Sequence, residues 1–172
     1  GLLILSKILN VIQMKWHSHK TLTAVLVFSF THNLFATFFA TLGSIIPDLI
    51  EKWFYGDFEK NQKNHRKWTH WWPIYVAGII FFSSQTYNLE INHNNFLLFV
   101  SQHKILPIIF FIFKYLMLGG LMHIIEDAFC GKVPLFDPNK KEIGIKLFRT
   151  GSIGEYIFII FVITVLLIFK KG

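Results

Sequence analysis

Histidines and carboxylates gather at the ends of the apolar runs in this 172-residue sequence. They form four short polar clusters: "HSHK" (17–20), "GSIIPD" (43–48), "HRKWTH" (65–70) and "HIIED" (123–127). Imidazole nitrogens together with carboxylate oxygens are the ligand mixture that zinc and other borderline divalent metals take in proteins. These residue types therefore indicate metal binding as the first chemistry to consider.

The fourth and second clusters contain the candidates with the clearest geometry. His123 and Asp127 are four residues apart, which places both side chains on one face of a helix. Ionisable groups at the end of an apolar helix are costly and therefore indicate function, although an interfacial pair exposed to water is the alternative. In the second cluster, Gly43 and Pro47 predict a helix break. This break would hold Asp48 at the membrane boundary, unless the motif is an ordinary helix-terminating turn.

The third cluster contains two histidines and a cation. His65 and His70 are five residues apart, or about 140° on a regular helix, so a loop or a helix start is needed if both are ligands. The planar fork of Arg66 suits a phosphate or a carboxylate, although a lipid headgroup contact would also explain it. An interfacial aromatic belt is the preferred interpretation of the neighbouring tryptophans, Trp68, Trp71 and Trp72.

The other polar positions are less informative. His19 taken alone would be interpreted as a surface histidine, and His17 is close enough to replace it as a candidate. His32 interrupts an apolar run, where it is predicted to cap backbone groups and is not assigned to the site. Cys130 is the only cysteine, so no internal disulfide can form, and its predicted role is that of a small buried hydrophobe.

The elements that must position these residues are predicted to be membrane helices. Hydrophobic residues make up 53% of the chain and charged residues only 16%, against about 25% charged residues in soluble domains. Four apolar runs, at 22–46, 71–84, 104–125 and 153–169, are separated by polar loops. Isolated strands cannot satisfy their backbone hydrogen bonds in lipid, so the predicted fold class is all-α, a polytopic membrane helical bundle.

The first apolar run, 22–46, is interrupted near its centre by His32 and Asn33. If it is a re-entrant hairpin that turns there, each arm has about 12 residues and is about 18 Å long. The remaining apolar runs then form about three transmembrane helices. All four polar clusters then lie on one side of the membrane, together with 13 of the 17 Lys and Arg residues. The positive-inside rule makes this side cytoplasmic. The alternative, a full span over 22–46, weakens the charge bias without reversing it.

The chain is basic, with 17 Lys and Arg residues against 10 Asp and Glu residues. In a soluble protein this excess would suggest nucleic acid binding. In a membrane protein it more often records orientation, so the lipid bilayer is the expected partner and no direct nucleic acid binding is expected. The predicted organisation is an amphipathic segment or upstream extension at 1–13, followed by a single membrane-embedded helical domain at 14–172.

The order of the four clusters resembles that of the YdjM-type membrane-bound metal-dependent hydrolases, also described as LexA-binding, inner-membrane-associated hydrolases. The family pattern is an early His, then G-S/A-x-x-P-D, H-R-x-x-T-H and H-x-x-x-D, and the segments "GKVPLFDP" (131–138) and "RTGSIGE" (149–155) resemble its later parts. The similarity extends from about His19 to Glu155. It implies a bacterial inner (cytoplasmic) membrane location and a polar constellation of His19, Asp48, His65, His70, His123 and Asp127.

The resemblance also implies a chemistry. A similar "PD" followed by "TH" occurs in zinc-dependent phospholipase C-like enzymes, which suggests a divalent metal, with Zn²⁺ as the first candidate, and phosphoester hydrolysis. The chain departs from the family where members often continue as P-D-x-D, because Leu49, Ile50 and Glu51 follow Asp48 here. One candidate ligand is therefore missing or replaced by Glu51, and a complete two-metal site is not predicted.

Two functions from different classes are consistent with the sequence. The leading hypothesis is a hydrolase in which Asp48 or Asp127 is the general base and Arg66 clamps the phosphate of a lipid or lipid-linked substrate at the cytoplasmic face. The alternative is a non-catalytic membrane scaffold or regulator that binds a cytoplasmic protein through basic loops. Its contact residues would be Lys60, Lys63, Lys140 and Lys141. The sequence does not identify the substrate or the oligomeric state.

Overall fold

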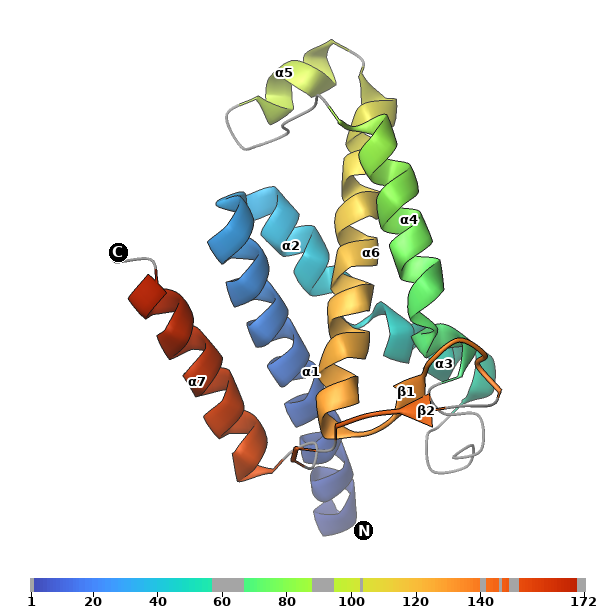
Figure 1. Ribbon diagram of the computed structural model, residues 1–172, viewed down its shortest axis with the longest axis vertical. Coiled ribbons are helices and arrows are strands. Elements are labelled where there is room, and N and C mark those ends of the chain that lie inside the picture. Colours follow the sequence, from blue (N-terminus) through green and yellow to red (C-terminus); the bar gives the residue numbers. More distant parts are fainter. Residues whose placement is uncertain are drawn as a thin grey trace.

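The computed structural model shows a mostly helical chain, as the sequence predicted (Figure 1). The described residues are 2–56, 67–87, 95–102, 104–139, 142–145, 147–148 and 152–169, of which 2–16, 99 and 169 are described by their backbone alone. Outside them lie the predicted site residues His65 and Arg66 and the loop lysines Lys60, Lys63, Lys140 and Lys141. At the centre is α6 (Ile105–Cys130), which packs against both α2 (Leu34–Gly43) and α4 (Trp72–Gln85).

The first two helices form a hairpin that turns at the position predicted from the sequence. α1 (Leu2–Thr31) ends before His32, whose φ of 49° is the left-handed conformation that reverses the chain. The Asn33 side chain accepts a hydrogen bond of 3.1 Å from the Ala36 N–H and so caps α2. α1 runs without a break from residue 2 into the hairpin, so the first polar cluster lies inside a helix. The domain division at residue 14 stays a prediction.

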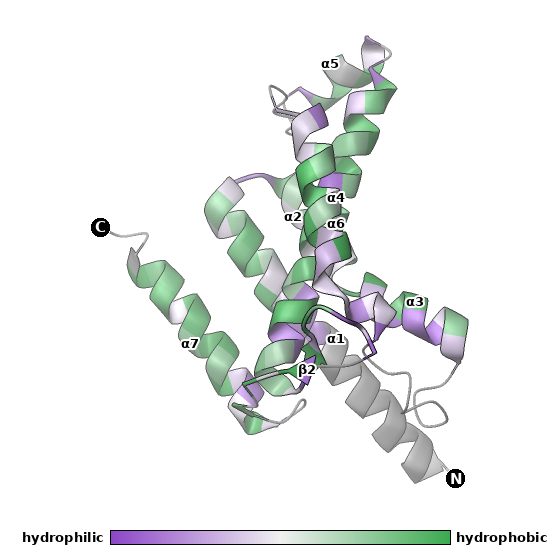
Figure 2. Cartoon of the chain, turned by 45° about the vertical axis from the view of Figure 1, so that its right-hand side comes forward, coloured by the Kyte–Doolittle hydropathy of each residue, from purple (hydrophilic) through white to green (hydrophobic). Residues whose placement is uncertain are grey.

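A change of direction separates α2 from α3 (Ile46–Tyr55), as the second cluster predicted. Pro47 occupies the first turn of α3, where its missing N–H costs no helical hydrogen bond. α3 is amphipathic, because Glu51 is buried whereas Trp53 and Phe54 are 84% and 73% exposed. In Figure 2 this helix projects sideways from the bundle. Asp48 therefore stands in the first turn of a helix with one polar and one aromatic face.

Small residues allow α2 to lie directly on α6. A Cβ at Gly119 would collide with the carbonyl oxygen of Ala40, and a Cβ at Gly43 would collide with the backbone of Leu116. Close approach of this kind is typical of helix pairs in membranes, where packing rather than the hydrophobic effect holds helices together. The apolar core around this contact consists of Val27, Ala36, Ala40, Ile108 and Phe111.

Two neighbouring tryptophans tie the segment after α6 to the start of α4. The indole N–H of Trp71 donates to the carbonyl oxygen of Phe136 at 2.8 Å, and that of Trp72 donates to the carbonyl oxygen of Leu135 at 2.5 Å. These two side chains thus join distant parts of the chain. This structural role is additional to the interfacial aromatic belt that was predicted for them. Trp68 is 50% exposed.

The remaining elements are short, apart from the last helix. α7 (Ile153–Phe169) lies beside α1 and matches the fourth predicted run (Figure 1). The short elements are α5 (Phe96–Ser101), the 3₁₀ turn η2 (Trp68–His70) and the antiparallel strands β1 (Val133–Pro134) and β2 (Glu142–Ile143).

Length and composition identify two segments of the described chain as able to cross a membrane. They are residues 34–55, which comprise α2 and α3, and the 26-residue helix α6, while α7 is a shorter apolar helix. These two candidate segments do not confirm the predicted count of about three crossing helices. α6 continues to Cys130, beyond the apolar run 104–125, so His123 and Asp127 lie on one helix, as their i, i+4 spacing predicted.

Candidate metal centre

Five of the predicted site residues come together near the C-terminal end of α6, which is its lower end in Figure 1. His19 is on α1, Asp48 on α3, His70 on η2, and His123 and Asp127 are both on α6. They form two groups that could each hold a metal ion, because the ligand atoms within each group lie within 4.8 Å of one another. One group is Asp48, His70 and His123, and the other is His19, His123 and Asp127. The use of these residues as ligands stays a prediction.

The turn before α4 positions His70. The Tyr75 hydroxyl donates to the carbonyl oxygen of Thr69 at 2.8 Å, and the Tyr75 ring lies where a Cβ at Gly120 would be. The tyrosine therefore fixes the backbone next to His70 against α6. His65 lies outside the described residues, so the bend that a shared His65–His70 site would need is not tested.

The first group has the spacing of ligands around one ion. Nε2 of His70 lies 3.2 Å from Nε2 of His123, and Oδ1 of Asp48 lies 3.5 and 3.4 Å from these two atoms. Two tetrahedral ligands at the zinc–nitrogen distance of about 2.0–2.1 Å are about 3.3–3.4 Å apart. Both histidines are fully buried, whereas the Asp48 side chain is 23% exposed. The three atoms therefore match one face of a zinc tetrahedron.

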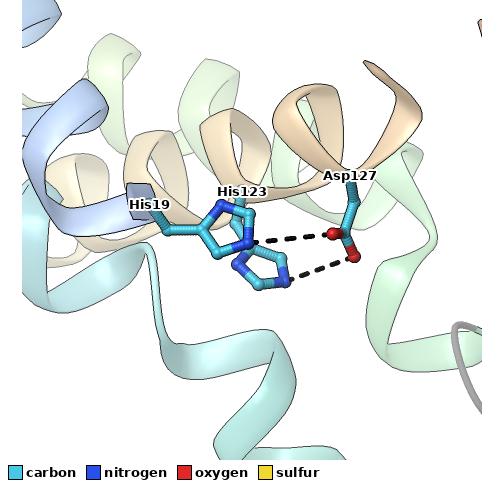
Figure 3. A group of neighbouring side chains, drawn as sticks. All are labelled: His19, His123 and Asp127. Atoms are coloured by element: carbon cyan, nitrogen blue, oxygen red, sulfur yellow. Dashed lines mark ion pairs between the residues drawn. The ribbon is translucent and has the colours of Figure 1, made fainter. Parts of the chain in front are cut away.

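Asp127 lies between the two groups. Its Oδ2 is 3.4 Å from Nε2 of His70 and 3.7 Å from Nε2 of His123, while its Oδ1 is 3.7 Å from Nε2 of His19 (Figure 3). The His19 ring leans over the ring of His123, with centroids 4.1 Å apart. Nδ1 of His123 has no hydrogen-bond partner within the part of the chain that the structure describes. The i, i+4 pair on α6 thus forms the middle of the centre.

Carboxylates also lie behind two of the histidines. Nδ1 of His70 is 2.9 Å from the Thr69 hydroxyl and 3.4 Å from Oε2 of Glu51, and the same hydroxyl donates to Glu51 at 3.3 Å. Nδ1 of His19 bonds to Oε2 of Glu126. A carboxylate at Nδ1 keeps the proton on that nitrogen and leaves the Nε2 lone pair for a metal. Both rings therefore present the correct nitrogen to the centre.

The carboxylates change the pKa of the two histidines that lie outside the candidate spans. Burial alone would lower the pKa of His70, but hydrogen bonds and charge from Asp127 and Asp48 outweigh burial and raise it to about 9. Burial also opposes protonation of His19, yet the hydrogen bond and charge of Glu126 raise its pKa above the ordinary value. The centre therefore attracts positive charge strongly, either as protons or as a metal ion.

Two further carboxylates, Glu126 and Glu51, lie beside the histidines of the centre. Glu126 stands three residues after His123, and this i, i+3 spacing is a signal that the two share one side of the helix. It also accepts a hydrogen bond of 3.3 Å from the Thr23 hydroxyl. The sequence suggests Glu51 only as a replacement ligand, whereas the structure places it behind His70.

Comparison with known proteins gives one match. The model of the family described as YdjM inner membrane protein matches residues 14–171, which includes every residue of the centre. Neither the comparison with curated proteins nor the comparison with solved structures found a match.

Proposed function

Since the chain belongs to the YdjM inner membrane protein family, we propose that it is a membrane-bound, metal-dependent hydrolase. Its metal is divalent, with Zn²⁺ as the first choice, and its substrate is a phosphoester of a lipid or of a lipid-linked molecule. The observation that carries the proposal is the triangle of Asp48 Oδ1, His70 Nε2 and His123 Nε2, with sides of 3.2–3.5 Å. Three protein ligands with nitrogen and oxygen donors and an open fourth position are typical of catalytic zinc.

The residues of the centre have separable roles in this chemistry. A divalent ion bound here would lower the pKa of a coordinated water and polarise a phosphoryl oxygen. Asp48 meets both histidines through Oδ1, so its Oδ2 is our candidate for the general base that accepts the proton of the attacking water. Asp127 is buried, and its Oδ2 lies beside the Nε2 atoms of His70 and His123, so it is a further candidate ligand. Arg66 as the phosphate clamp stays a prediction.

The surroundings of the centre favour a lipid substrate. α3 presents Asp48 and Glu51 to the centre and exposes Trp53 and Phe54 on its other face. Trp68, also exposed, belongs to the same short turn as His70. Exposed aromatic residues and an amphipathic helix are typical of the membrane–water interface. A site at that depth meets the phosphate groups of lipids directly.

The lengths of the helices support a chain that crosses the membrane several times. α6 has 26 residues and is about 39 Å long, which exceeds the hydrocarbon core of about 30 Å. The second arm of the hairpin, α2, has only 10 residues before the chain changes direction into α3, so we propose that the hairpin is re-entrant and that residues 34–55 do not cross. α4 and α7 with α6 would complete about three crossings. The basic residues predicted on the side of the centre make that side cytoplasmic.

Metal removal tests the proposed function. Detergent-purified protein is expected to contain tightly bound divalent metal and to hydrolyse a chromogenic phosphodiester, bis(4-nitrophenyl) phosphate. Chelation should abolish hydrolysis and added Zn²⁺ should restore it, while circular dichroism shows an unchanged helical content. Protein that binds no metal and is fully stable without it contradicts the proposal. Capture of a cytoplasmic protein that depends on the loop lysines would then favour the scaffold.

Glu51→Gln is expected to weaken metal binding by about 10–100-fold, the usual effect of losing a carboxylate behind a ligating histidine. The amide keeps the shape of the side chain but removes the charge that lies 3.4 Å from Nδ1 of His70. Competition with a fluorescent zinc chelator measures the affinity. Glu142→Gln, on the exposed strand β2, is the matched control and should leave the affinity unchanged. Equal affinities in the two variants would rule out this role for Glu51.

A further inference from the structure

The centre contains four carboxylates, twice the number that one divalent ion can neutralise. Four carboxylates contact its three histidines: Asp48, Glu51, Glu126 and Asp127. All but Asp48 are at most 9% exposed. Histidine binds metal as the neutral imidazole, which offsets none of this charge, and buried carboxylates are costly unless cations compensate them. When all four carboxylates are ionised, one divalent ion offsets two of the four charges, and two ions offset all four.

The two oxygens of Asp127 point to different partners. Oδ2 contacts His70 and His123 at 3.4 and 3.7 Å, whereas Oδ1 contacts His19 at 3.7 Å. Figure 3 shows this division, with one dashed line from each oxygen. A carboxylate that offers one oxygen to each of two ligand groups has the geometry of a bridge between two ions.

The histidine of the second group is supported in the same way as that of the first. Glu126 bonds to Nδ1 of His19 as Glu51 approaches Nδ1 of His70. In each case Nε2 is the atom left for a metal, and it is Nε2 of His19 that faces Asp127. A histidine that served only as a neighbour of the first ion would not need its own orienting carboxylate, which is held in turn by the Thr23 hydroxyl.

We propose that the centre binds two divalent ions bridged by Asp127, and this inference rests on the proposed function. The first ion is bound by Asp48, His70 and His123. The second is bound by His19 Nε2 and Asp127 Oδ1 beside the His123 ring, in the group whose ligand atoms lie within 4.8 Å of one another. In phosphoester hydrolysis a second ion stabilises the leaving oxygen while the first serves the attacking one.

The proposed ligands of the second ion explain how the chain could bind two ions although it lacks the second acid of the P-D-x-D motif. The second acid of that motif, absent here, is not needed if the second ion takes its ligands from α1 and α6. Glu51 then serves His70, and Glu126 serves His19. The two ions differ in their dependence on individual residues, because His19 belongs only to the second group.

Metal stoichiometry of the full chain tests the inference. Protein in detergent is stripped with a chelator, reloaded with Zn²⁺, freed of excess metal and measured by mass spectrometry of the elements. The wild type should retain about two ions per chain and His19→Ala about one. His17→Ala, two residues earlier on the same helix and exposed, is the control and should retain two. In Mn²⁺-loaded protein, electron paramagnetic resonance should show coupled ions in the wild type and an uncoupled ion in His19→Ala.

A second variant keeps the test decisive if His19→Ala does not fold. Glu126→Gln preserves the size of the side chain and should give a two-step Zn²⁺ titration, in which the weaker step is shifted by about 10-fold or more. One ion per chain in the wild type, unchanged in His19→Ala, overturns the inference and leaves the proposed function intact. Loss of both ions from folded His19→Ala also overturns it, because His19 would then belong to a single site. A wild type without metal overturns both proposals.

Discussion

Replacing His123 with alanine is expected to remove the tightly bound metal and to lower phosphodiester hydrolysis by about 10³-fold or more. His123 is a member of both ligand groups, so its loss affects each of them. Its Nε2 lies 3.2 Å from Nε2 of His70 and 3.4 Å from Oδ1 of Asp48, and its ring packs on the ring of His19. Metal analysis and the chromogenic assay measure the two effects.

The fold of this variant should survive. Nδ1 of His123 has no hydrogen-bond partner among the described residues, so alanine removes a buried polar atom whose burial costs free energy. Helical content and the elution volume in detergent should therefore match those of the wild type. His17→Ala, on an exposed position of α1, should retain both metal and hydrolysis. Full metal content in His123→Ala would show that the centre is not the metal site.

Local patterns were enough to predict several parts of this arrangement. The i, i+4 spacing of His123 and Asp127 predicts a shared helix face, and Pro47 predicts the break before Asp48, because both depend only on neighbours in the chain. The turn at His32 follows from polar residues in an apolar run. The membrane character follows from composition, and the family match agrees with it.

Other parts depend on contacts between distant residues and leave little signal in one sequence. His19 and Glu126 are 107 residues apart, so nothing local predicts that one orients the other. The helix boundaries were missed for a related reason. Hydropathy ends the apolar runs at 22 and 125, whereas α1 and α6 also include the polar residues of the first and fourth clusters, of which His19, Glu126 and Asp127 are buried.

The packing of α2 on α6 connects the fold to the centre. Gly119, His123 and Asp127 recur at intervals of four on α6 and therefore share one face of that helix. Gly119 admits the carbonyl of Ala40, and α2 ends shortly before the first turn of α3, which contains Asp48. The distance between Asp48 and His123 is thus set by a helix contact that only glycine permits.

Gly119→Ala is therefore expected to weaken both stability and metal binding. The new methyl group would collide with the carbonyl oxygen of Ala40 and would lie 2.8 Å from the backbone nitrogen of Ser44, and neither backbone atom can move without shifting α2. Overpacking of this kind costs about 3 kcal/mol, or a decrease of roughly 6–12 °C in Tm for a chain of this size. Thermal unfolding in detergent and zinc affinity on the same sample measure the two effects.

The comparison with Gly78→Ala separates this coupling from a general effect of added volume. A Cβ at Gly78 would also be crowded, with Cγ of Met117 at 2.9 Å, but that neighbour is a flexible side chain that can adopt another rotamer. Gly78 lies on α4, away from the α2–α6 contact, so its variant should lose little stability and retain its zinc affinity. If both variants lost stability equally but bound zinc normally, the α2–α6 contact would not set the position of Asp48. If only Gly119→Ala lost zinc affinity, the centre would depend on that contact for its geometry.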